Sequence, residues 1–315
     1  MLYANSNDQK GTAVSLARPL TRRYGCLIAL AKCLATDCVA AAQDARLAAA
    51  IPGIESAIRH SGAEVAVAFR TLDGRSEWLL HADEPFHAAS TMKVAVLVEL
   101  YRQVHQGKVR LDETLTIKNQ FRSLVDGSPY TLDPNDDSET ALYQAVGGTR
   151  TLAQLSELMI TVSSNLATNL LMDKLGVDNI RAGVHALGAD GMNVLRGVED
   201  SKAFQQGLNN TTTARALLTL LQAIARGEAV DTDSSRQMIE ILEQQTFNDR
   251  IPAGLPAGTR VAHKTGEITR IQHDAAIVFA PRPFVLVVLT RGLEDSKQGA
   301  ALIADITRRL YQATQ

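Results

Sequence analysis

Hydrophobic and polar residues alternate in short segments near both ends of the chain, which is the pattern of half-buried β-strands. Two N-terminal segments flank Asp73-Gly74, a dipeptide typical of a hairpin turn. A C-terminal segment contains the unbroken apolar run from Val285 to Leu289, which indicates a buried strand. The expected strands are 63–69, 76–81, 260–264, 273–279 and 284–290.

Between the two groups of strands, from about residue 91 to 244, apolar residues recur with helical spacing. The exception is 121–148, a polar segment with two turn signals that we expect to be a loop. Helices are also expected at 44–60, with a kink or break near Pro52-Gly53, and at 297–313.

This order of elements predicts an α+β fold, in which both chain ends form one antiparallel sheet with flanking helices around an inserted all-helical lobe. The expected α/β lobe comprises 43–88 and 260–315, and the expected helical lobe comprises 89–259. A cleft between two such lobes is the natural place for a functional site.

Composition narrows the classes of partner. The chain has 315 residues, of which 45% are hydrophobic, and a formal net charge of −2. It contains no dense run of Lys and Arg, so we expect no nucleic-acid partner. Its seven histidines include no pair at the close spacing of metal ligands, so we expect no metal site, and we identify no cofactor.

The first 42 residues have the order of an export signal, since Arg22-Arg23 precedes an apolar stretch that ends in small residues. All three cysteines lie in this segment, so no disulfide framework is expected in the rest of the chain. No later apolar run approaches the length that spans a membrane. We therefore expect a mature protein that is periplasmic or secreted, without membrane insertion.

The strongest chemical signal is Ser90, followed three residues later by Lys93, at the start of a helix that is apolar nearly all round. Residues three apart lie on one helix face, so the Lys93 amine can lie beside the Ser90 hydroxyl. A desolvated lysine loses its proton more easily, and a neutral amine can then accept the serine proton. By itself this spacing also fits a helix cap followed by a solvated lysine.

Three further features follow in order along the chain. Ser163 and Asn165 lie in a polar turn between two apolar helical stretches. Glu199 lies in a polar segment 36 residues after Ser163. Lys264-Thr265-Gly266 ends one predicted strand just before another, 101 residues after Ser163, and its glycine would let a substrate backbone approach closely. Each feature alone fits a cap, a loop carboxylate or a hairpin, but their combination is not expected by chance.

With these residues the sequence resembles the class A β-lactamase family of serine penicillin-recognising enzymes, whose motifs are Ser-x-x-Lys, Ser-Asp-Asn and Lys-Thr-Gly. The resemblance implies that Ser90 is the nucleophile and that Lys93 activates it. It implies that Ser163 carries a proton to the lactam nitrogen and that Glu199 activates the water that releases the acyl group.

The same resemblance implies how a small β-lactam substrate is held. Asn165 would bind the substrate amide and orient Lys93, while Lys264 and Thr265 would receive the substrate carboxylate. Gly266 would line the binding strand, and the backbone N–H groups of Ser90 and Glu267 would form the oxyanion hole. The resemblance implies a monomer without a cofactor, and an activity that gives antibiotic resistance.

Two positions depart from the family pattern. Ser164 stands where the Ser-Asp-Asn motif has Asp, and Ala203 stands where the family has an Asn four residues after its catalytic Glu. The 73-residue separation of Ser90 and Ser163 is also longer than usual, which predicts an enlarged loop over the cleft at about 126–140.

Three functions follow as hypotheses. The first is β-lactam hydrolysis through an acyl-serine intermediate, which Glu199 favours. The second is a D-alanyl-D-alanine peptidase or esterase that β-lactams acylate and that releases them slowly. The third is a non-catalytic peptidoglycan-binding module, which the joint presence of Ser90, Lys93 and Lys264 disfavours.

Overall fold

The computed structural model describes residues 45–315. The predicted export signal therefore falls outside the described residues. Within the described part of the chain, no helix is long and apolar enough to cross a membrane. The division into two lobes at the boundaries given above stays a prediction.

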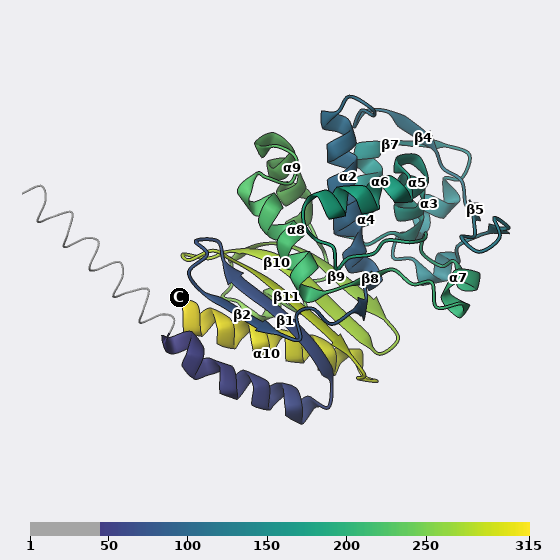
Figure 1. The fold of residues 1–315 in the computed structure, drawn as a ribbon. Helices are drawn as coiled ribbons and strands as arrows, with labels where there is room; N and C mark the ends of the chain where they lie inside the picture. The colour runs from purple at the N-terminus through teal and green to yellow at the C-terminus, as the bar shows by residue number, and fades with distance from the viewer. Residues whose placement is uncertain (1–44) are drawn as a thin grey trace, which may run out of the picture. The chain divides into compact units, whose positions relative to one another are not determined.

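Five strands from both ends of the chain form one antiparallel sheet, in the order β2-β1-β11-β10-β9 (Figure 1). The central pair joins the two ends of the sequence, since Val67 of β1 faces Val288 of β11. The strands are β1 (Glu64–Thr71), β2 (Glu77–Leu80), β9 (Arg260–Ile268), β10 (Ile271–Phe279) and β11 (Phe284–Arg291). The predicted α+β class, with a sheet built from both chain ends, is confirmed.

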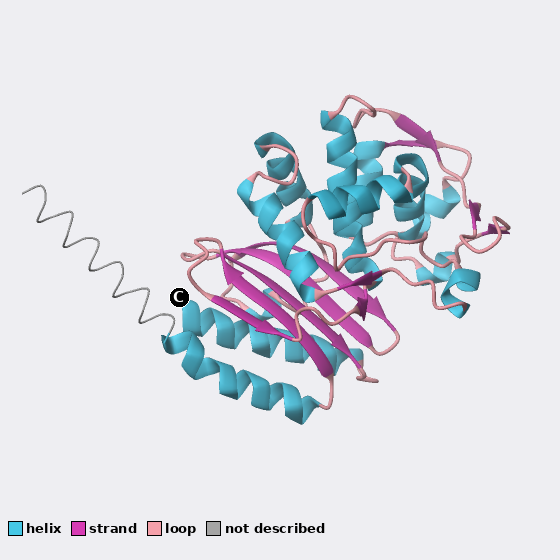
Figure 2. Ribbon diagram, viewed as in Figure 1, coloured by secondary structure: helices cyan, strands magenta, loops and turns pink. Residues whose placement is uncertain are grey.

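Helices cover both faces of the sheet, which explains the unbroken apolar run of β11 (Figure 2). Phe284, Leu286 and Val288 pack with the helix at residues 45–61 and with α10 (Ser296–Thr314). The alternate residues Val285, Val287 and Leu289 face the other side of the sheet. There they belong to a second hydrophobic core, which also contains buried residues of α8 (Ala214–Arg226). A strand with both faces buried has no polar side to alternate with.

The N-terminal helix is continuous through Pro52 and Gly53, so of the predicted kink or break the break does not occur. Proline removes one backbone hydrogen bond from a helix interior. Here Leu47, Ile54 and Ile58 are buried against the sheet, and this packing keeps the helix intact on both sides of the proline.

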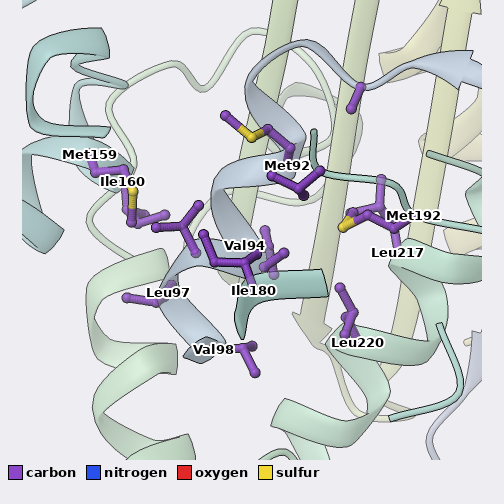
Figure 3. Packing of buried hydrophobic residues seen from close by; sticks show 14 of the residues in the cluster. Met92, Val94, Leu97, Val98, Met159, Ile160, Ile180, Met192, Leu217 and Leu220 are labelled. Atoms are coloured by element: carbon purple, nitrogen blue, oxygen red, sulfur yellow. The ribbon is translucent and has the colours of Figure 1, made fainter. Parts of the chain in front are cut away.

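The segment between β1-β2 and β9 is mainly helical. Its long helices are α2 (Lys93–His105), α4 (Leu152–Thr161), α5 (Asn165–Leu175), α6 (Val177–Ala186), α8 and α9 (Thr232–Leu242). Its short helices are η1 (Ala89–Met92), η2 (Pro134–Asp136), α3 (Thr140–Gln144), α7 (Ser201–Gln205) and η3 (Pro252–Gly254). The buried helix predicted after Ser90 is confirmed: α2 runs through the helical core, where Val94, Leu97 and Val98 are in contact with surrounding helices (Figure 3).

Three two-stranded sheets accompany the helices of this predicted helical region. These are β3 (Phe86–His87) with β8 (Thr211–Thr212), β4 (Thr114–Thr116) with β7 (Thr149–Thr151), and β5 (Phe121–Arg122) with β6 (Pro129–Tyr130). Strands of two or three residues are too short to show an alternating pattern. The predicted loop at 121–148 contains β5, β6, η2 and α3, joined by irregular chain.

Candidate active site

Ser90 lies in η1, a single 3₁₀ turn that leads directly into α2. Its neighbours Thr91 and Met92 are buried, whereas Ser90 itself is half-buried. Strand β9 passes close to this turn at Gly266, where an added Cβ would lie 3.1 Å from the Thr91 nitrogen and 3.2 Å from the Ala89 Cβ. The absent side chain of Gly266 thus lets the sheet edge pack against the serine turn itself, rather than only against a substrate.

Lys93 is fully buried, and its ammonium nitrogen donates to the Ser163 carbonyl at 2.6 Å, the Ser163 hydroxyl at 3.1 Å and Asn165 Oδ1 at 2.9 Å. Burial lowers the pKa of Lys93 from 10.5 to about 7, against the opposing charges of Asp137 and Glu199. A large fraction of Lys93 is therefore neutral near pH 7 and able to accept a proton.

Ser163 joins the two buried lysines. Its hydroxyl oxygen accepts from Lys93 and also from Lys264 Nζ, at 3.0 Å, and its backbone has a φ of 59°. Lys264 donates in addition to the Thr265 carbonyl at 2.9 Å. Burial, and then the charge of Lys93, lowers the pKa of Lys264 well below its usual value. The Ser163 hydroxyl can thus exchange a proton with either amine.

Asn165 connects Lys93 to Glu199. Its side-chain nitrogen donates to Glu199 Oε1 at 2.9 Å, and the backbone N–H of Asp133 donates to Oε2 at 3.0 Å. Glu199 is half-buried, with a φ of 62°, and burial raises the pKa of its carboxyl group. Ser163, Lys93, Asn165 and Glu199 therefore form one continuous hydrogen-bonded chain.

Two hollows meet at the serine, and Ser90, Asn165 and Glu267 line both of them. The larger, of about 390 Å³, has apolar side chains from Val198, Phe204 and Ile268 together with His87, Arg196 and Glu199. The smaller, of about 260 Å³, is polar and is lined by Ser163, Thr265, Arg250, Asp136, Ser138 and Phe247. All the predicted site residues thus lie in this region of the structure.

A family model described as "Beta-lactamase enzyme family" matches residues 47–314. The chain belongs to this β-lactamase enzyme family.

Individual relatives agree with this family assignment. A β-lactamase of Bacillus licheniformis is 29% identical over 238 residues, covering 73% of each chain. The crystal structure of a β-lactamase from Sphaerobacter thermophilus is similar with a TM-score of 0.70 and 28% identity, over 86% of this chain and 97% of that one. A PBP-A mutant, L158E, solved as an acyl-enzyme complex with penicillin G, has a TM-score of 0.70 and 30% identity, over 82% and 93%. Together, the family match and these relatives make this chain a serine β-lactamase enzyme of the class A type.

Ala203, the departure from the β-lactamase family pattern after Glu199, is fully buried in α7. Its backbone N–H donates to Asp200 Oδ1 at 3.2 Å, and the same carboxylate also accepts from Ser123 Oγ and from the Leu124 N–H, each at 2.8 Å. Asp200 therefore joins the segment after Glu199 to Ser123 and Leu124, without an amide side chain at position 203.

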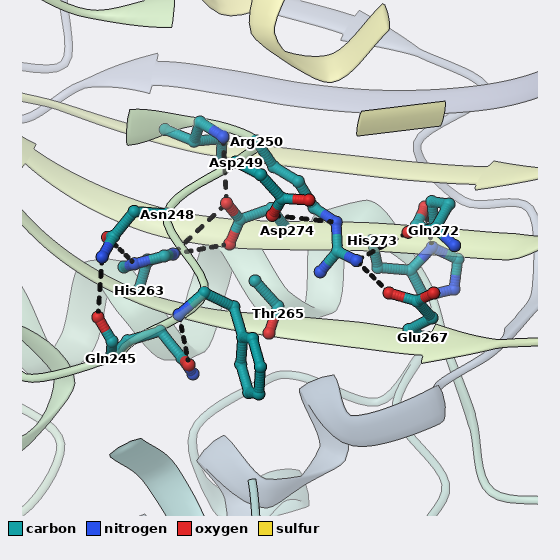
Figure 4. A network of polar contacts seen from close by, with 12 residues as sticks. Gln245, Asn248, Asp249, Arg250, His263, Thr265, Glu267, Gln272, His273 and Asp274 are labelled. Carbon is teal, nitrogen blue, oxygen red and sulfur yellow. Dashed lines mark hydrogen bonds and ion pairs between the residues drawn. The ribbon is translucent and has the colours of Figure 1, made fainter. Parts of the chain in front are cut away.

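Sequence reasoning missed Arg250, a cation in the smaller hollow of this β-lactamase-family site. Arg250 is 3% exposed, and its guanidinium donates to Glu267 and, at 2.6 Å, to Gln272 Oε1 (Figure 4). The nearby His263 and Asp274 form a buried pair at 3.0 Å, and Asp274 also accepts the Ile251 N–H. No motif surrounds Arg250 in the sequence, so only the folded loop shows that it reaches the site.

Proposed function

We propose that this β-lactamase-family enzyme opens β-lactam rings through an ester on Ser90. The observation that supports the proposal best is the hydrogen-bonded chain from Ser163 through Lys93 and Asn165 to Glu199. It places a lysine with a lowered pKa one helical turn from the nucleophile and a carboxylate with a raised pKa at the other end of the chain.

In the acylation step, the Ser90 oxygen adds to the lactam carbonyl carbon while its proton passes to neutral Lys93. The ring C–N bond then breaks, and the proton moves from Lys93 through the Ser163 hydroxyl to the departing nitrogen. The N–H groups of Ser90 and Glu267 stabilise the oxyanion in between. The product is an open ring held as a serine ester.

In the deacylation step, Glu199 takes a proton from a water that attacks the ester carbonyl, and this proton is returned to the Ser90 oxygen as the ester breaks. Lys264 and Thr265 bind the substrate carboxylate in the smaller hollow, where Arg250 adds a third donor group. Asn165 binds the substrate amide. The apolar wall of the larger hollow then faces the rest of the acyl group.

A slow-releasing peptidase or esterase is the second candidate, and two observations favour it. Ala203 supplies no amide to hold the water beside Glu199, and the chain resembles PBP-A as well as β-lactamases. Both candidates share the acyl-enzyme on Ser90 and differ only in how fast it is hydrolysed.

The deciding experiment mixes the purified enzyme with a chromogenic cephalosporin and follows colour and intact mass together. Many turnovers per enzyme support the β-lactamase, whereas a persistent adduct after a single turnover supports the slow esterase. In Glu199→Gln we expect the adduct to accumulate, because general-base catalysis contributes about 10²- to 10⁴-fold. The control is Glu157→Gln on the exposed side of α4, which removes a carboxylate away from the cleft. Turnover by Glu199→Gln at the wild-type rate would assign deacylation to another group.

We further propose that residues 1–42 direct export and that the mature enzyme acts as a periplasmic or secreted monomer. The support is the basic, apolar and small order of the N-terminal segment. Expression of the full chain should give a shortened protein in the extracellular or periplasmic fraction. Replacement of Arg22 and Arg23 by glutamine should retain the full-length chain inside the cell.

A further inference from the structure

A buried carboxylate from the loop over the cleft contacts the start of α5, and no step proposed above uses it. Asp137 directly follows η2 and is 8% exposed. Its Oδ2 atom accepts the backbone N–H groups of Asn165 and Leu166, both at 2.8 Å, and the hydroxyl of Ser164 at 3.2 Å. The carboxylate thus binds the first N–H groups of a helix, where negative charge is favoured.

The other contacts of Asp137 hold it in place from its own side of the cleft. The Tyr143 hydroxyl donates to Oδ2 at 2.9 Å, and the Glu139 N–H donates to Oδ1 at 3.0 Å. Burial, and then the charge of Asp137, raises the pKa of Tyr143, which keeps this hydroxyl protonated as a donor. Five donors from two separate parts of the chain therefore converge on one carboxylate.

Ser164, the residue between Ser163 and Asn165, binds both Asp137 and the first turn of α5. The Ser-Asp-Asn motif has a carboxylate in its own middle position, and this chain has a hydroxyl there. That hydroxyl accepts the Ala167 N–H at 3.2 Å as an ordinary helix cap and donates to Asp137. The motif in this chain therefore lacks its own carboxylate. The carboxylate of Asp137, 27 residues earlier in the chain, lies beside Ser164 instead.

We propose that Asp137 is a positioning residue, which supplies from the loop the carboxylate that the motif lacks and thereby fixes Asn165 between Lys93 and Glu199. The inference rests on the proposed function, because the role of Asn165 is defined by that reaction. Asp137 touches no reacting atom. It acts by holding the backbone N–H of Asn165, whose side chain contacts both proton-transfer groups.

The electrostatic consequence falls on Lys93. Burial lowers its pKa, and the negative charges of Asp137 and Glu199 oppose that change, while Lys264 is the neighbouring cation. Loss of the Asp137 charge should therefore lower the pKa of Lys93 further. A helix cap whose charge did not reach Lys93 would leave the pKa of Lys93 unchanged, so this quantity separates Asp137 from an ordinary helix cap.

The test measures the pKa of Lys93 without any substrate, by ¹³C NMR of enzyme labelled at the lysine Cε, with the Lys93 signal assigned from Lys93→Arg. We expect Asp137→Asn to lower this pKa by about half a unit or more. Adding Ser164→Asp to Asp137→Asn should return it toward the wild-type value, because the charge is restored next to the same N–H groups.

The matched control is Asp231→Asn. Asp231 caps α9 in a similar way, accepting the Ser234 N–H at 2.7 Å and the Ser234 hydroxyl at 3.0 Å, but it is not part of the site. This variant loses a helix-capping carboxylate and should leave the pKa of Lys93 unchanged. An equal change in both variants would show a general effect of charge and overturn the proposal.

Kinetics provide the second readout. Acylation by a chromogenic cephalosporin should slow about tenfold in Asp137→Asn and recover in the double variant, since misplacement of a proton-transfer group slows its step. The proposal would be overturned if Asp137→Asn left the pKa of Lys93 at its wild-type value, or if the double variant did not recover the acylation rate. If Asp137→Asn fails to fold, the test uses Ser164→Asp alone, which should raise the pKa of Lys93. An unchanged pKa in this variant would also overturn the proposal. Because the NMR arm needs no substrate, an enzyme that does not hydrolyse β-lactams would refute the proposed function and leave this test intact.

Discussion

Lowering the pH below about 7 should slow the acylation of Ser90 in proportion to the fraction of Lys93 that becomes protonated. Only the neutral amine can accept the serine proton. Lys93 is fully buried with a pKa of about 7, so its protonation state changes over an accessible range of pH. The acylation rate should rise with pH through about 7 and then level off.

The size of the effect follows from the pKa. About half of the enzyme carries neutral Lys93 near pH 7, roughly a tenth at one pH unit lower and roughly a hundredth at two. A decrease from 10.5 to about 7 corresponds to about 5 kcal/mol of destabilisation of the charged amine by burial.

The pKa of Lys93 also determines how its contribution to the free energy of unfolding changes with pH. Since the folded pKa lies below the unfolded one, the unfolded chain binds more protons between about pH 7 and 10.5. The penalty for charging Lys93 is therefore fully present below pH 7 and disappears as the pH rises toward 10.5. Relative to the wild type, Lys93→Met should gain most stability at low pH and lose that advantage as the pH increases.

The assay is the stopped-flow acylation burst of the wild-type enzyme, because loss of the Glu199 charge would itself lower the pKa of Lys93. The rate constant at saturating cephalosporin reports Lys93, whereas titration of Lys264 alters binding of the substrate carboxylate and appears in the half-saturation concentration. A rate constant at saturation that is flat from about pH 5 to about pH 9, or that falls as the pH rises, would refute the role of Lys93.

Three further substitutions test the geometry of the site. Gly266→Ala should lower kcat/KM at least about tenfold, because its Cβ would press on the turn that carries Ser90. The control is Gly53→Ala, whose Cβ would meet only Arg309 at 3.5 Å and which should leave kcat/KM unchanged. Equal kcat/KM in the two variants would contradict this prediction. Arg250→Met should raise KM about tenfold with little change in kcat, and this effect should vanish for a methyl-ester substrate that lacks the carboxylate; an unchanged KM would remove Arg250 from binding. Ala203→Asn should lower the free energy of unfolding by about 1–3 kcal/mol without faster deacylation, since Ala203 is fully buried; faster deacylation at full stability would show that the amide reaches the water.

Much of the fold follows from local patterns. The run from Val285 to Leu289 reads as a buried strand because it is apolar on both sides, and α2 reads as a buried helix for the same reason. Ser90 and Lys93 are recognised as a pair because they are three residues apart in sequence, and one turn of helix brings such residues to the same face.

The features that sequence reasoning missed depend on tertiary contacts. Asp137 lies 28 residues before the Asn165 N–H that it binds, and no local pattern joins the two. Lys93 donates to Ser163 and Asn165, some 70 residues further on, and among residues 45–315 no hydrogen bond joins its amine to the Ser90 hydroxyl. The spacing of Ser90 and Lys93 therefore placed both residues at the start of α2 but did not predict the partners of the amine.

Acylation of Ser90 by β-lactams is the step on which every other step proposed for this enzyme depends. The direct measurement mixes the enzyme with benzylpenicillin, quenches the reaction in the first turnover, and locates the added mass by peptide mapping. We expect one ring-opened penicillin on the peptide that contains Ser90, and no adduct in Ser90→Ala, because no other residue of the site combines a hydroxyl at the start of α2 with Lys93 one turn away. An adduct on a different residue, or an equal rate of labelling in Ser90→Ala, would contradict it.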